Sequence, residues 1–311
     1  MDAQYDPGRL WTSCDDGAVT GRSNADRCPG VLRPWIAEDG ALIRLRLVGG
    51  ELTSQMLTDL MAISARWADG TVLLTKRANL QLRGIKPALD GAGTACVPEE
   101  FVEAIAKAGF LPAPTHELVR NIMVSPLSGR TDGRANLFPI AGALDKALCA
   151  DPLFAGLSAR FLFVFDDGRG DLVDRTLDLG AMAVDAENAQ VRLGSETWGE
   201  VVELESLPEV LLDFAARFMR ARGASTDAPW HVDELQTPLT EAHHARDLRT
   251  QVTSPFRPRG EFTQNDGRIA EIVEVPDGIV THDLATHVLA RAGSELIVTP
   301  WRSLVLPDLE N

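Results

Sequence analysis

The stretch Thr75-Lys76-Arg77-Ala78-Asn79-Leu80-Gln81-Leu82-Arg83-Gly84-Ile85 decides the fold of this chain. It follows an apolar run at 71–74, and its polar and apolar residues alternate. Alternation with a period of two predicts a half-buried strand, with one side on the core and the other facing a cleft or solvent. The polar side presents guanidinium and amide donors, which suit carboxylates, from Arg77, Asn79, Gln81 and Arg83. A solvated sheet face explains the same alternation, so the strand alone leaves both interpretations open.

The composition indicates a globular protein of about two domains. The chain has 311 residues, 45% of them hydrophobic, and a mean hydropathy of −0.04. No apolar run approaches the length of a membrane span, and residues 1–6 lack the basic and apolar segments of a secretory signal. We therefore expect a cytoplasmic protein with no membrane partner.

The charged residues argue against nucleic acid as a partner, because the net charge is −15. The basic residues are four lysines and 26 arginines, a bias that a GC-rich genome explains, although it does not explain two arginines on one strand face. The four cysteines, Cys14, Cys28, Cys96 and Cys149, are widely scattered and show no Cys-x-x-Cys spacing. They predict neither disulfides nor a metal site of their own.

A strand–helix–strand unit occurs twice in the sequence. The first copy has a strand at 42–47, a helix capped by Thr53 and the strand at 75–85; the second has a strand at 269–275, a helix capped by Thr281 and a strand at 295–306. Aligning the copies pairs Thr75 with Thr299, Leu80 with Leu304 and Leu82 with Leu306. An internal duplication is the simplest account, and chance similarity of two common units is the alternative.

The region between the copies has a different pattern. It predicts helices at 98–108, 141–150 and 207–222, strands at 120–126 and 160–165, and a hairpin formed by 179–184 and 190–193. The expected division of the chain is a flexible arm (1–26), a first half-domain (27–115), an α/β domain (116–225), a linker (226–250) and a second half-domain (251–311).

Several of these motifs resemble the nitrite/sulfite reductase superfamily: residues 74–85, Arg44-x-Arg46, and Arg120-Asn121-Ile122 with Ser125-Pro126. Within it, Arg27-Cys28-Pro29-Gly30 and Thr299-Pro300-Trp301-Arg302 most resemble the precorrin-3B synthases of aerobic cobalamin (vitamin B12) biosynthesis. The resemblance runs from residue 27 to residue 311. It implies an α+β fold, with duplicated ferredoxin-like half-domains, an inserted α/β domain of the sulfite reductase type, and a tetrapyrrole cleft.

The resemblance also implies a reaction and its binding residues. Precorrin-3A, O2 and NADH-derived electrons would yield precorrin-3B, hydroxylated and carrying a lactone, so the enzyme would be an oxidoreductase of the monooxygenase type. The substrate-binding residues that it implies are Arg77, Asn79, Gln81, Arg83, Arg120, Asn121 and Arg160, with the carboxylate role resting chiefly on Arg77, Arg83 and Arg120. For each arginine, an ion pair at the surface or between domains is the alternative. The resemblance identifies no catalytic residue.

The chain departs from the family pattern in the residues that would bind the cofactor. Relatives bind a 4Fe-4S cluster through cysteines spaced Cys-x5-Cys and Cys-x3-Cys after the second half-domain, and this chain has no cysteine beyond Trp301. We therefore expect the cluster on a separate segment or an electron-donor partner, or else a non-catalytic tetrapyrrole-binding fragment or scaffold. A siroheme-type nitrite or sulfite reductase relative is the other alternative, but Leu162 stands where such relatives have a lysine.

No metal site is expected elsewhere in the chain. The adjacent His243 and His244 would point apart on either a helix or a strand, which disfavours a shared iron. Asp166 and Asp167, just before Gly168, predict a turn rather than a metal site.

Overall fold

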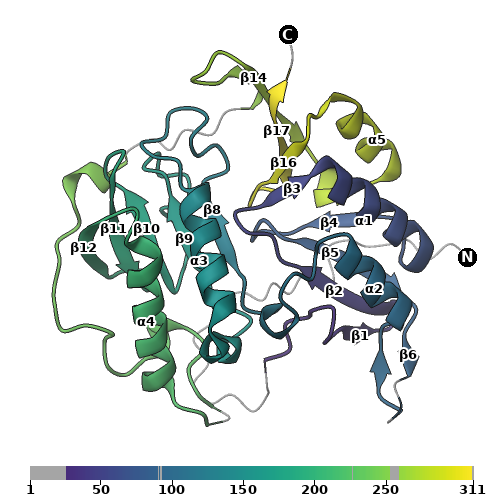
Figure 1. The fold of residues 1–311 in the computed structure, drawn as a ribbon, viewed down its shortest axis with the longest axis horizontal. Coiled ribbons are helices and arrows are strands. Elements are labelled where there is room, and N and C mark those ends of the chain that lie inside the picture. The colour runs from purple at the N-terminus through teal and green to yellow at the C-terminus, as the bar shows by residue number, and fades with distance from the viewer. Residues whose placement is uncertain (1–25, 90, 92, 226, 253–258, 310–311) are drawn as a thin grey trace, which may run out of the picture.

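The computed structural model describes residues 26–89, 91, 93–225, 227–252 and 259–309. The fold is α+β, with two interlocked half-domains on the right of Figure 1 and an α/β domain on the left. All of the predicted flexible arm except Asp26 lies outside the described residues. Among the described helices, none has the length and apolar character needed to span a membrane.

The two half-domains have the same order of elements, which confirms the internal duplication. The first consists of β1 (Trp35–Ala37), β2 (Gly40–Leu45), β3 (Glu51–Thr53), α1 (Ser54–Trp67), β4 (Val72–Leu74) and β5 (Leu80–Ile85). The second consists of β13 (Gly260–Thr263), β14 (Ile269–Glu274), β15 (Ile279–Val280), α5 (His282–Arg291), β16 (Glu295–Val298) and β17 (Ser303–Leu309). The predicted helix caps are also confirmed, because the Thr53 side chain accepts from Met56 N at 3.0 Å and that of Thr281 from Leu284 N at 3.3 Å.

Each half-domain completes the sheet of the other. The sheet orders are β1-β2-β5-β4-β15 and β13-β14-β17-β16-β3, so β15 and β3 are exchanged. Both exchanged strands pair antiparallel with their new neighbours, Val280 opposite Val72 and Leu296 opposite Leu52. The helices α1 and α5 lie side by side (Figure 1), and one core extends across both halves. The first half-domain also carries β6 (Ala88–Leu89), β7 (Ala95–Cys96) and α2 (Glu99–Lys107).

The organising stretch does not form the single strand that its alternation predicts. Strands β4 and β5 pair antiparallel as a hairpin, with Leu74 opposite Leu80, and residues 75–79 form the turn between them. The Thr75 hydroxyl accepts the N–H groups of Arg77 and Asn79, at 3.3 and 3.1 Å, and Ala78 has a positive φ of 54°. Arg77 and Asn79 therefore lie in a turn, where the strand period does not apply.

The same turn recurs in the second half-domain, in agreement with the alignment of Thr75 with Thr299. The Thr299 hydroxyl accepts from Trp301 N and Ser303 N, both at 3.2 Å. Arg302 occupies the position of Ala78, with φ 61°. Trp301 therefore corresponds to Arg77, and the second turn carries its arginine one position later, at Arg302.

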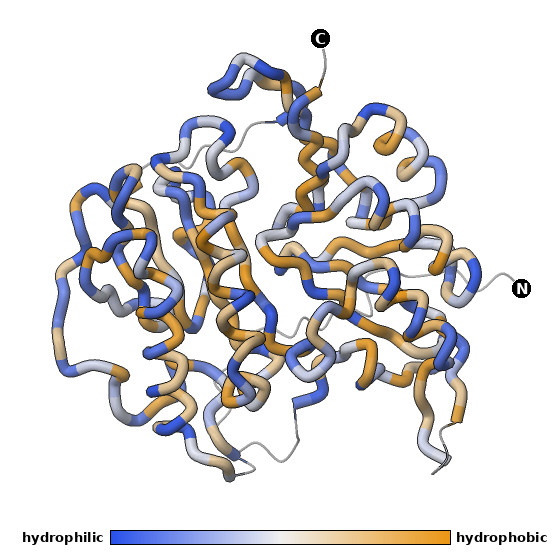
Figure 2. The backbone as a smooth tube through the Cα atoms, in the orientation of Figure 1, coloured by the Kyte–Doolittle hydropathy of each residue, from blue (hydrophilic) through white to orange (hydrophobic). Residues whose placement is uncertain are grey.

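The α/β domain has its own sheet and core. Its elements are β8 (Ile122–Val124), α3 (Phe138–Ala150), β9 (Phe163–Asp166), β10 (Leu179–Ala183), β11 (Asn188–Leu193), β12 (Trp198–Glu203) and α4 (Leu207–Arg222). Strands β8, β9 and β10 are parallel, while β11 and β12 continue the sheet antiparallel. The inner strands are hydrophobic along their length (Figure 2), and Phe161, Phe163 and Phe165 pack under α3 and α4.

Residues 48–50 join the three sheets. Val48 forms an isolated parallel bridge with Ile122, and Gly49 N donates to Ile122 O at 2.8 Å. The next residue, Gly50, accepts from Val298 N, also at 2.8 Å. This short segment therefore connects the first half-domain to the α/β domain and to the second half-domain.

Candidate functional site

Two arginines at the end of β2 form the buried part of the candidate site. Arg46 is 4% exposed; its Nε donates to Asn121 Oδ1 at 3.1 Å and its Nη1 to Pro29 O at 3.3 Å. Arg46 Nη2 and Arg44 Nε are buried without an acceptor among the described residues. Burial, assisted by the positive charge of Arg44, lowers the pKa of Arg46 to about 9. An anion bound beside these groups would accept hydrogen bonds from the unsatisfied donors and would raise the pKa of Arg46.

Asn79 contributes a further buried donor to this region. Its Oδ1 accepts from Leu47 N at 2.9 Å, which ties the turn at 75–79 to the chain that leaves β2. Its Nδ2 is buried and has no acceptor within the described part of the chain. Because buried polar groups are almost always hydrogen-bonded, three such donors in one region indicate a binding site for an acceptor.

A tight crevice, too narrow to hold a water molecule, lies beside the buried arginines. It is lined by Val31, Arg44, Arg46, Phe110, Leu111, Pro112, Ala113, Glu117 and Arg120. Glu117 is held by the N–H groups of Val31 and Leu32, at 2.7 and 2.9 Å. In this structure the crevice has room for neither a carboxylate arm nor a macrocycle.

Arg77 and Arg160 meet where the first half-domain contacts the α/β domain. Arg77 Nη1 donates to Arg160 O at 2.9 Å, and the Arg160 guanidinium lies 5.0 Å from the centre of the Trp230 ring. Arg160 precedes β9 instead of lying on the strand predicted at 160–165. Arg77 is close enough to Arg46 for its charge to lower the Arg46 pKa further. Arg44, Arg46, Arg77 and Arg160 therefore lie in one region of an acidic protein, with Glu117 beside Arg46.

Of the remaining predicted ligands, Arg83 lies away from the buried arginines, and Arg120, Asn121 and Gln81 lie near them. Arg83 pairs with Asp39 at 3.0 Å, at the end of β5 remote from the turn at 75–79. Arg120 binds Asp145 of α3 bidentately, at 2.7 and 2.8 Å. Asn121 Nδ2 donates to two backbone carbonyls, and its Oδ1 accepts from Arg46. Gln81 is buried on β5, opposite Arg44. Their predicted roles remain untested, but the structure does not gather all seven residues around one point.

Three residues of the candidate site were not predicted as ligands from the sequence: Arg44, Arg46 and Trp230. The Arg44-x-Arg46 motif was visible in the sequence, but its alternation predicted only that both arginines share one face of a strand. In the structure Arg46 lies just beyond the end of β2 and is buried. Trp230 lies in the segment that was read as a linker, and no local pattern signals its contact with Arg160.

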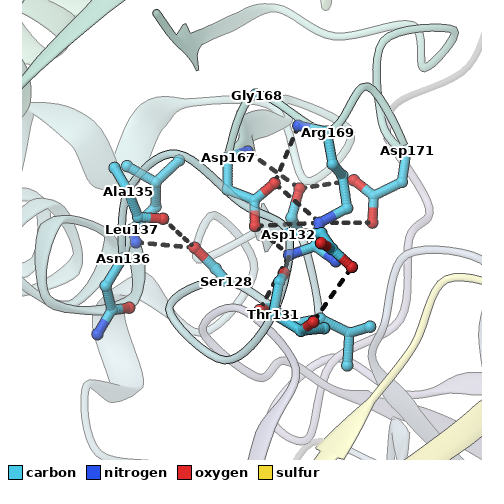
Figure 3. Close-up of polar contacts among 12 residues, drawn as sticks. Ser128, Thr131, Asp132, Ala135, Asn136, Leu137, Asp167, Gly168, Arg169 and Asp171 are labelled. Atoms are coloured by element: carbon cyan, nitrogen blue, oxygen red, sulfur yellow. Dashed lines mark hydrogen bonds and ion pairs between the residues drawn. The ribbon is translucent and has the colours of Figure 1, made fainter. Parts of the chain in front are cut away.

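The acidic loop after β9 has a structural role, because its carboxylates bind neighbouring backbone N–H groups and Arg169. Asp166 accepts from the N–H groups of Gly168, Gly170 and Leu172, each at 2.9 Å, which confirms the predicted turn. Asp167 binds Arg169 through Nε and Nη2, and Arg169 Nη2 also donates to the backbone oxygens of Leu127 and Thr131 (Figure 3). Asp166, Asp167 and Asp171 approach one another closely enough to resemble a metal site. Their oxygen atoms are instead used by these donors and by Ser125.

Asp171 makes the stability of this loop depend on pH. Burial, and then the charge of Asp166, raises the pKa of Asp171 to about 7. Between pH 4 and 7 the native state keeps a proton that the unfolded state releases, so this residue lowers the free energy of unfolding as the pH rises. We expect the stability of Asp171→Asn relative to the wild type to rise by about 2 kcal/mol between pH 5.5 and pH 8, as measured by urea denaturation.

The control for this experiment is Asp266→Asn, which removes an exposed carboxylate whose pKa is lowered by Arg268 and its backbone. It should show no gain at pH 8. A loss of stability in Asp171→Asn that is equal at both pH values would contradict the pH dependence assigned to this carboxylate.

Two other features are weaker candidates for a binding site. A hollow of about 680 Å³ beside α5 is lined by Glu261, Ile269, Arg291, Ala292, Gly293, Asp308 and Leu309. Its single lining arginine is engaged by Glu261 and Glu271, so an anion gains little there. His243 and His244 are exposed, in a stretch without regular structure.

The described cysteines do not fit an iron–sulfur cluster. Cys28 is buried before β1, Cys96 lies on β7 and Cys149 on α3. Within the described residues, the group of potential metal-binding side chains that the structure brings together contains aspartates and no cysteine. The fourth cysteine, Cys14, lies outside the described residues.

Comparisons with known proteins agree with the fold. Residues 36–89 match the family described as nitrite/sulfite reductase ferredoxin-like half domain. A precorrin-3B synthase of Sinorhizobium sp is 30% identical over 165 residues, which cover 51% of this chain and 33% of that protein. The solved structure of the NirA protein of Mycobacterium tuberculosis matches 92% of this chain and 60% of its own, with a TM-score of 0.65 and 19% identity.

These matches confirm the resemblance predicted from the motifs. The chain carries a nitrite/sulfite reductase ferredoxin-like half domain and has a fold of the sulfite reductase type. It spans about a third of the length of the curated relative.

Proposed function

We propose that this chain, which carries a nitrite/sulfite reductase ferredoxin-like half domain, binds a carboxylate-rich tetrapyrrole and acts in a precorrin-3B synthase-type reaction of cobalamin biosynthesis. The similarity to a precorrin-3B synthase supports this substrate class and the assignment to the oxidoreductases. In the full reaction, precorrin-3A would be hydroxylated with O2 and NADH-derived electrons and would close a lactone. An iron–sulfur cluster would supply the electrons from another segment or partner, since the described cysteines do not fit one.

The observation that carries the proposal is the group of buried donors near Arg46. Arg44 Nε, Arg46 Nη2 and Asn79 Nδ2 are buried without acceptors in the described chain, and a buried donor that is left unsatisfied is costly. An ionised carboxylate accepts several such bonds and would offset the burial and the Arg44 charge that lower the pKa of Arg46. The crevice beside Arg46 must widen to admit a carboxylate arm, while Arg77 and Arg160 would face other arms at the domain contact.

The proposal is tested by the binding of uroporphyrin III, a porphyrin with carboxylates on every ring. We expect Arg46→Met to weaken its binding at least 10-fold, because a charge-assisted hydrogen bond contributes about 1.5–3 kcal/mol. Fluorescence quenching of the porphyrin gives the dissociation constant. Circular dichroism and urea denaturation of the unliganded variant show whether the fold persists.

The matched control is Arg83→Met, which removes an arginine paired with Asp39 at the far end of β5. Its affinity should stay within about twofold of the wild type, since exposed ion pairs contribute little. An equal loss in both variants would place the ligand along the polar side of β5, as the sequence predicts. A wild-type protein that binds no porphyrin would refute the proposal, and selective binding of siroheme would favour a siroheme-type reductase relative.

A further inference from the structure

The hollow beside α5 lies where the duplication would place a counterpart of α2. The helices of the two half-domains form a row in which α2 contacts α1 and α1 contacts α5 (Figure 1). In the first half-domain the Phe101 ring of α2 packs edge-on against Trp67 at the end of α1, with 6.1 Å between the ring centres, and Phe101 is fully buried. The described residues place no helix in the corresponding position beside α5. A hollow of about 680 Å³ lies there instead.

Three residues that line the hollow correspond to residues at the contact between α1 and α2. The alignment of the two copies that pairs Thr75 with Thr299 also pairs these lining residues with residues of the first half-domain: Arg291 with Trp67, Ala292 with Ala68 and Leu309 with Ile85. Ala68 and Ala292 each cap the C-terminus of their helix, and the backbone N–H of each donates to the carbonyl four residues earlier at 2.8 Å. Because Trp67 is the residue that contacts Phe101, the hollow lies at the end of α5 that corresponds to the α2 contact.

The strands at the hollow have the same register as their counterparts in the first half-domain. Ala41 lies opposite Ile85 in the first half-domain and Ile269 lies opposite Leu309 in the second, and each pair is followed by an irregularity in the strand register. Ala41 and Ile85 are fully buried in the core to which α2 contributes, whereas Ile269 is partly exposed. The described residues therefore leave open, in the second copy, a surface whose counterpart is buried in the first.

Arg291 gives the hollow a contact surface that differs from that of Trp67. Its guanidinium is held at the edges by Glu261, at 2.9 Å, and by Glu271, at 2.7 Å, and 36% of the side chain is exposed. A guanidinium bound at its edges still offers its planar faces to an aromatic ring. An aromatic residue in the position of Phe101 would therefore stack on Arg291 where Phe101 meets the Trp67 ring.

The charged groups around the hollow favour a basic partner. The ion pairs in and around it connect three arginines, Arg130, Arg268 and Arg291, with five carboxylates: Glu261, Asp266, Glu271, Glu295 and Asp308. Two negative charges are therefore in excess, in a chain that is itself acidic. The first turn of α2 carries Glu99 and Glu100, so a helix with that sequence would be repelled at this site.

We propose that the hollow beside α5 is the docking site of an amphipathic helix from a partner polypeptide, with an aromatic anchor over Arg291 and basic residues in its first turn. The similar proteins leave room for such a partner, because the precorrin-3B synthase and the NirA protein both carry polypeptide beyond the part that this chain matches. The helix would complete the core of the second half-domain as α2 completes that of the first. This inference does not depend on the proposed tetrapyrrole binding.

The test uses a fluorescent peptide with the sequence of residues 97–110, in which Glu99→Lys, Glu100→Lys and Glu103→Lys reverse the charge. Fluorescence anisotropy measures its dissociation constant with the full chain, and we expect saturable binding of one peptide per chain. The same peptide with Phe101→Asp should bind at least about 10-fold more weakly, because a buried aromatic anchor dominates such interfaces. The unmodified sequence should also bind more weakly, since its acidic first turn meets the excess carboxylates.

Two variants of the chain locate the binding site. Nothing lies within 4 Å of an ideal Cβ at Gly293, so Gly293→Trp places a large side chain in the hollow without a clash against the backbone. This variant should weaken peptide binding at least about 10-fold. Gly142→Trp, at an exposed position of α3 with equally open surroundings, should keep the affinity within about twofold of the wild type. Circular dichroism shows whether both variants keep the fold.

The proposal is overturned if the wild type does not bind the lysine peptide, or if Gly293→Trp binds it as the wild type does. Equal affinity for the Phe101→Asp peptide would also overturn it, because attraction to the net charge of the chain would then account for the binding. Hydrogen exchange gives an independent measurement. The bound peptide should slow exchange of the Ala292 N–H, at the hollow, and leave that of Ala68 unchanged. Slower exchange at Ala68 alone would place the peptide at the α2 contact and contradict the proposal.

Discussion

Replacing Arg169 with alanine is expected to lower the free energy of unfolding by about 3–5 kcal/mol. The side chain is 1% exposed and binds Asp167 through Nε at 2.9 Å and Nη2 at 2.6 Å. It also supplies a donor to two backbone carbonyls, and its Nε lies 3.9 Å from Asp171. Without it, two buried carboxylates lose their counter-charge and the loop loses its cross-link to residues 127–131. Urea denaturation at pH 7.5 measures the loss.

Two comparisons isolate the charge in this prediction. Arg268→Ala removes an exposed arginine that is paired with Asp266 and should leave the transition unchanged. Lowering the pH should restore part of the stability of Arg169→Ala, because protonation neutralises the carboxylates that have lost their counter-charge. A loss that is small at pH 7.5, or the same at every pH, would mean that Arg169 mainly fills space.

The second large effect is expected at Gly50, in the segment that joins the three sheets. Its φ is +82°, and a Cβ there would lie 2.2 Å from the carbonyl oxygen of Val298. That carbonyl belongs to backbone that is fixed by the Val298 N–Gly50 O hydrogen bond of 2.8 Å, so the clash cannot be relieved by turning a side chain. We expect Gly50→Ala to cost at least about 3 kcal/mol, the sum of backbone strain and a displaced β16.

Gly70→Ala is the matched control for this substitution. Gly70 has nearly the same φ, +81°, but nothing lies within 4 Å of its ideal Cβ. It should lose only the strain of the left-handed conformation, about 1–2 kcal/mol. Hydrogen exchange should be faster at Val298 in Gly50→Ala and unchanged there in Gly70→Ala. Equal losses in the two variants would show that the β16 backbone yields easily.

The parts of the fold that were predictable from the sequence depend on local chemistry. The helix caps at Thr53 and Thr281, the duplication and the helix that ends at Gly223 follow from short-range hydrogen bonding and hydrophobic spacing. The turn at 75–79 was not predicted. Its residues alternate between polar and apolar like those of a strand, and the sequence does not show that the Thr75 hydroxyl closes a turn there. The exchange of β3 and β15 could not be predicted, since it depends on contacts between distant segments.

The candidate site was predicted in part, for a related reason. The motif at 75–85 contains Arg77 and Asn79, which lie at the candidate site, and their role as ligands stays a prediction. The motif could not show that Asp145 binds Arg120 or that Asp39 binds Arg83, because each partner lies far away in the sequence. Trp230, which contacts Arg160, comes from a segment whose composition resembles a linker. Which charges are paired is decided by tertiary packing, which the strand pattern does not contain.

The exchanged strands have a consequence for how the chain is synthesised. Strand β3 pairs with β16, whose residues follow about 240 positions later. At roughly 5–20 residues per second, a ribosome needs about 12–48 s to supply that partner. During this time the first half-domain has an unpaired strand and an open sheet edge, while the α/β domain, with its own core, can already fold. The nascent chain is therefore expected to acquire its middle first, and its N-terminal portion to depend on chaperones until the last strands emerge.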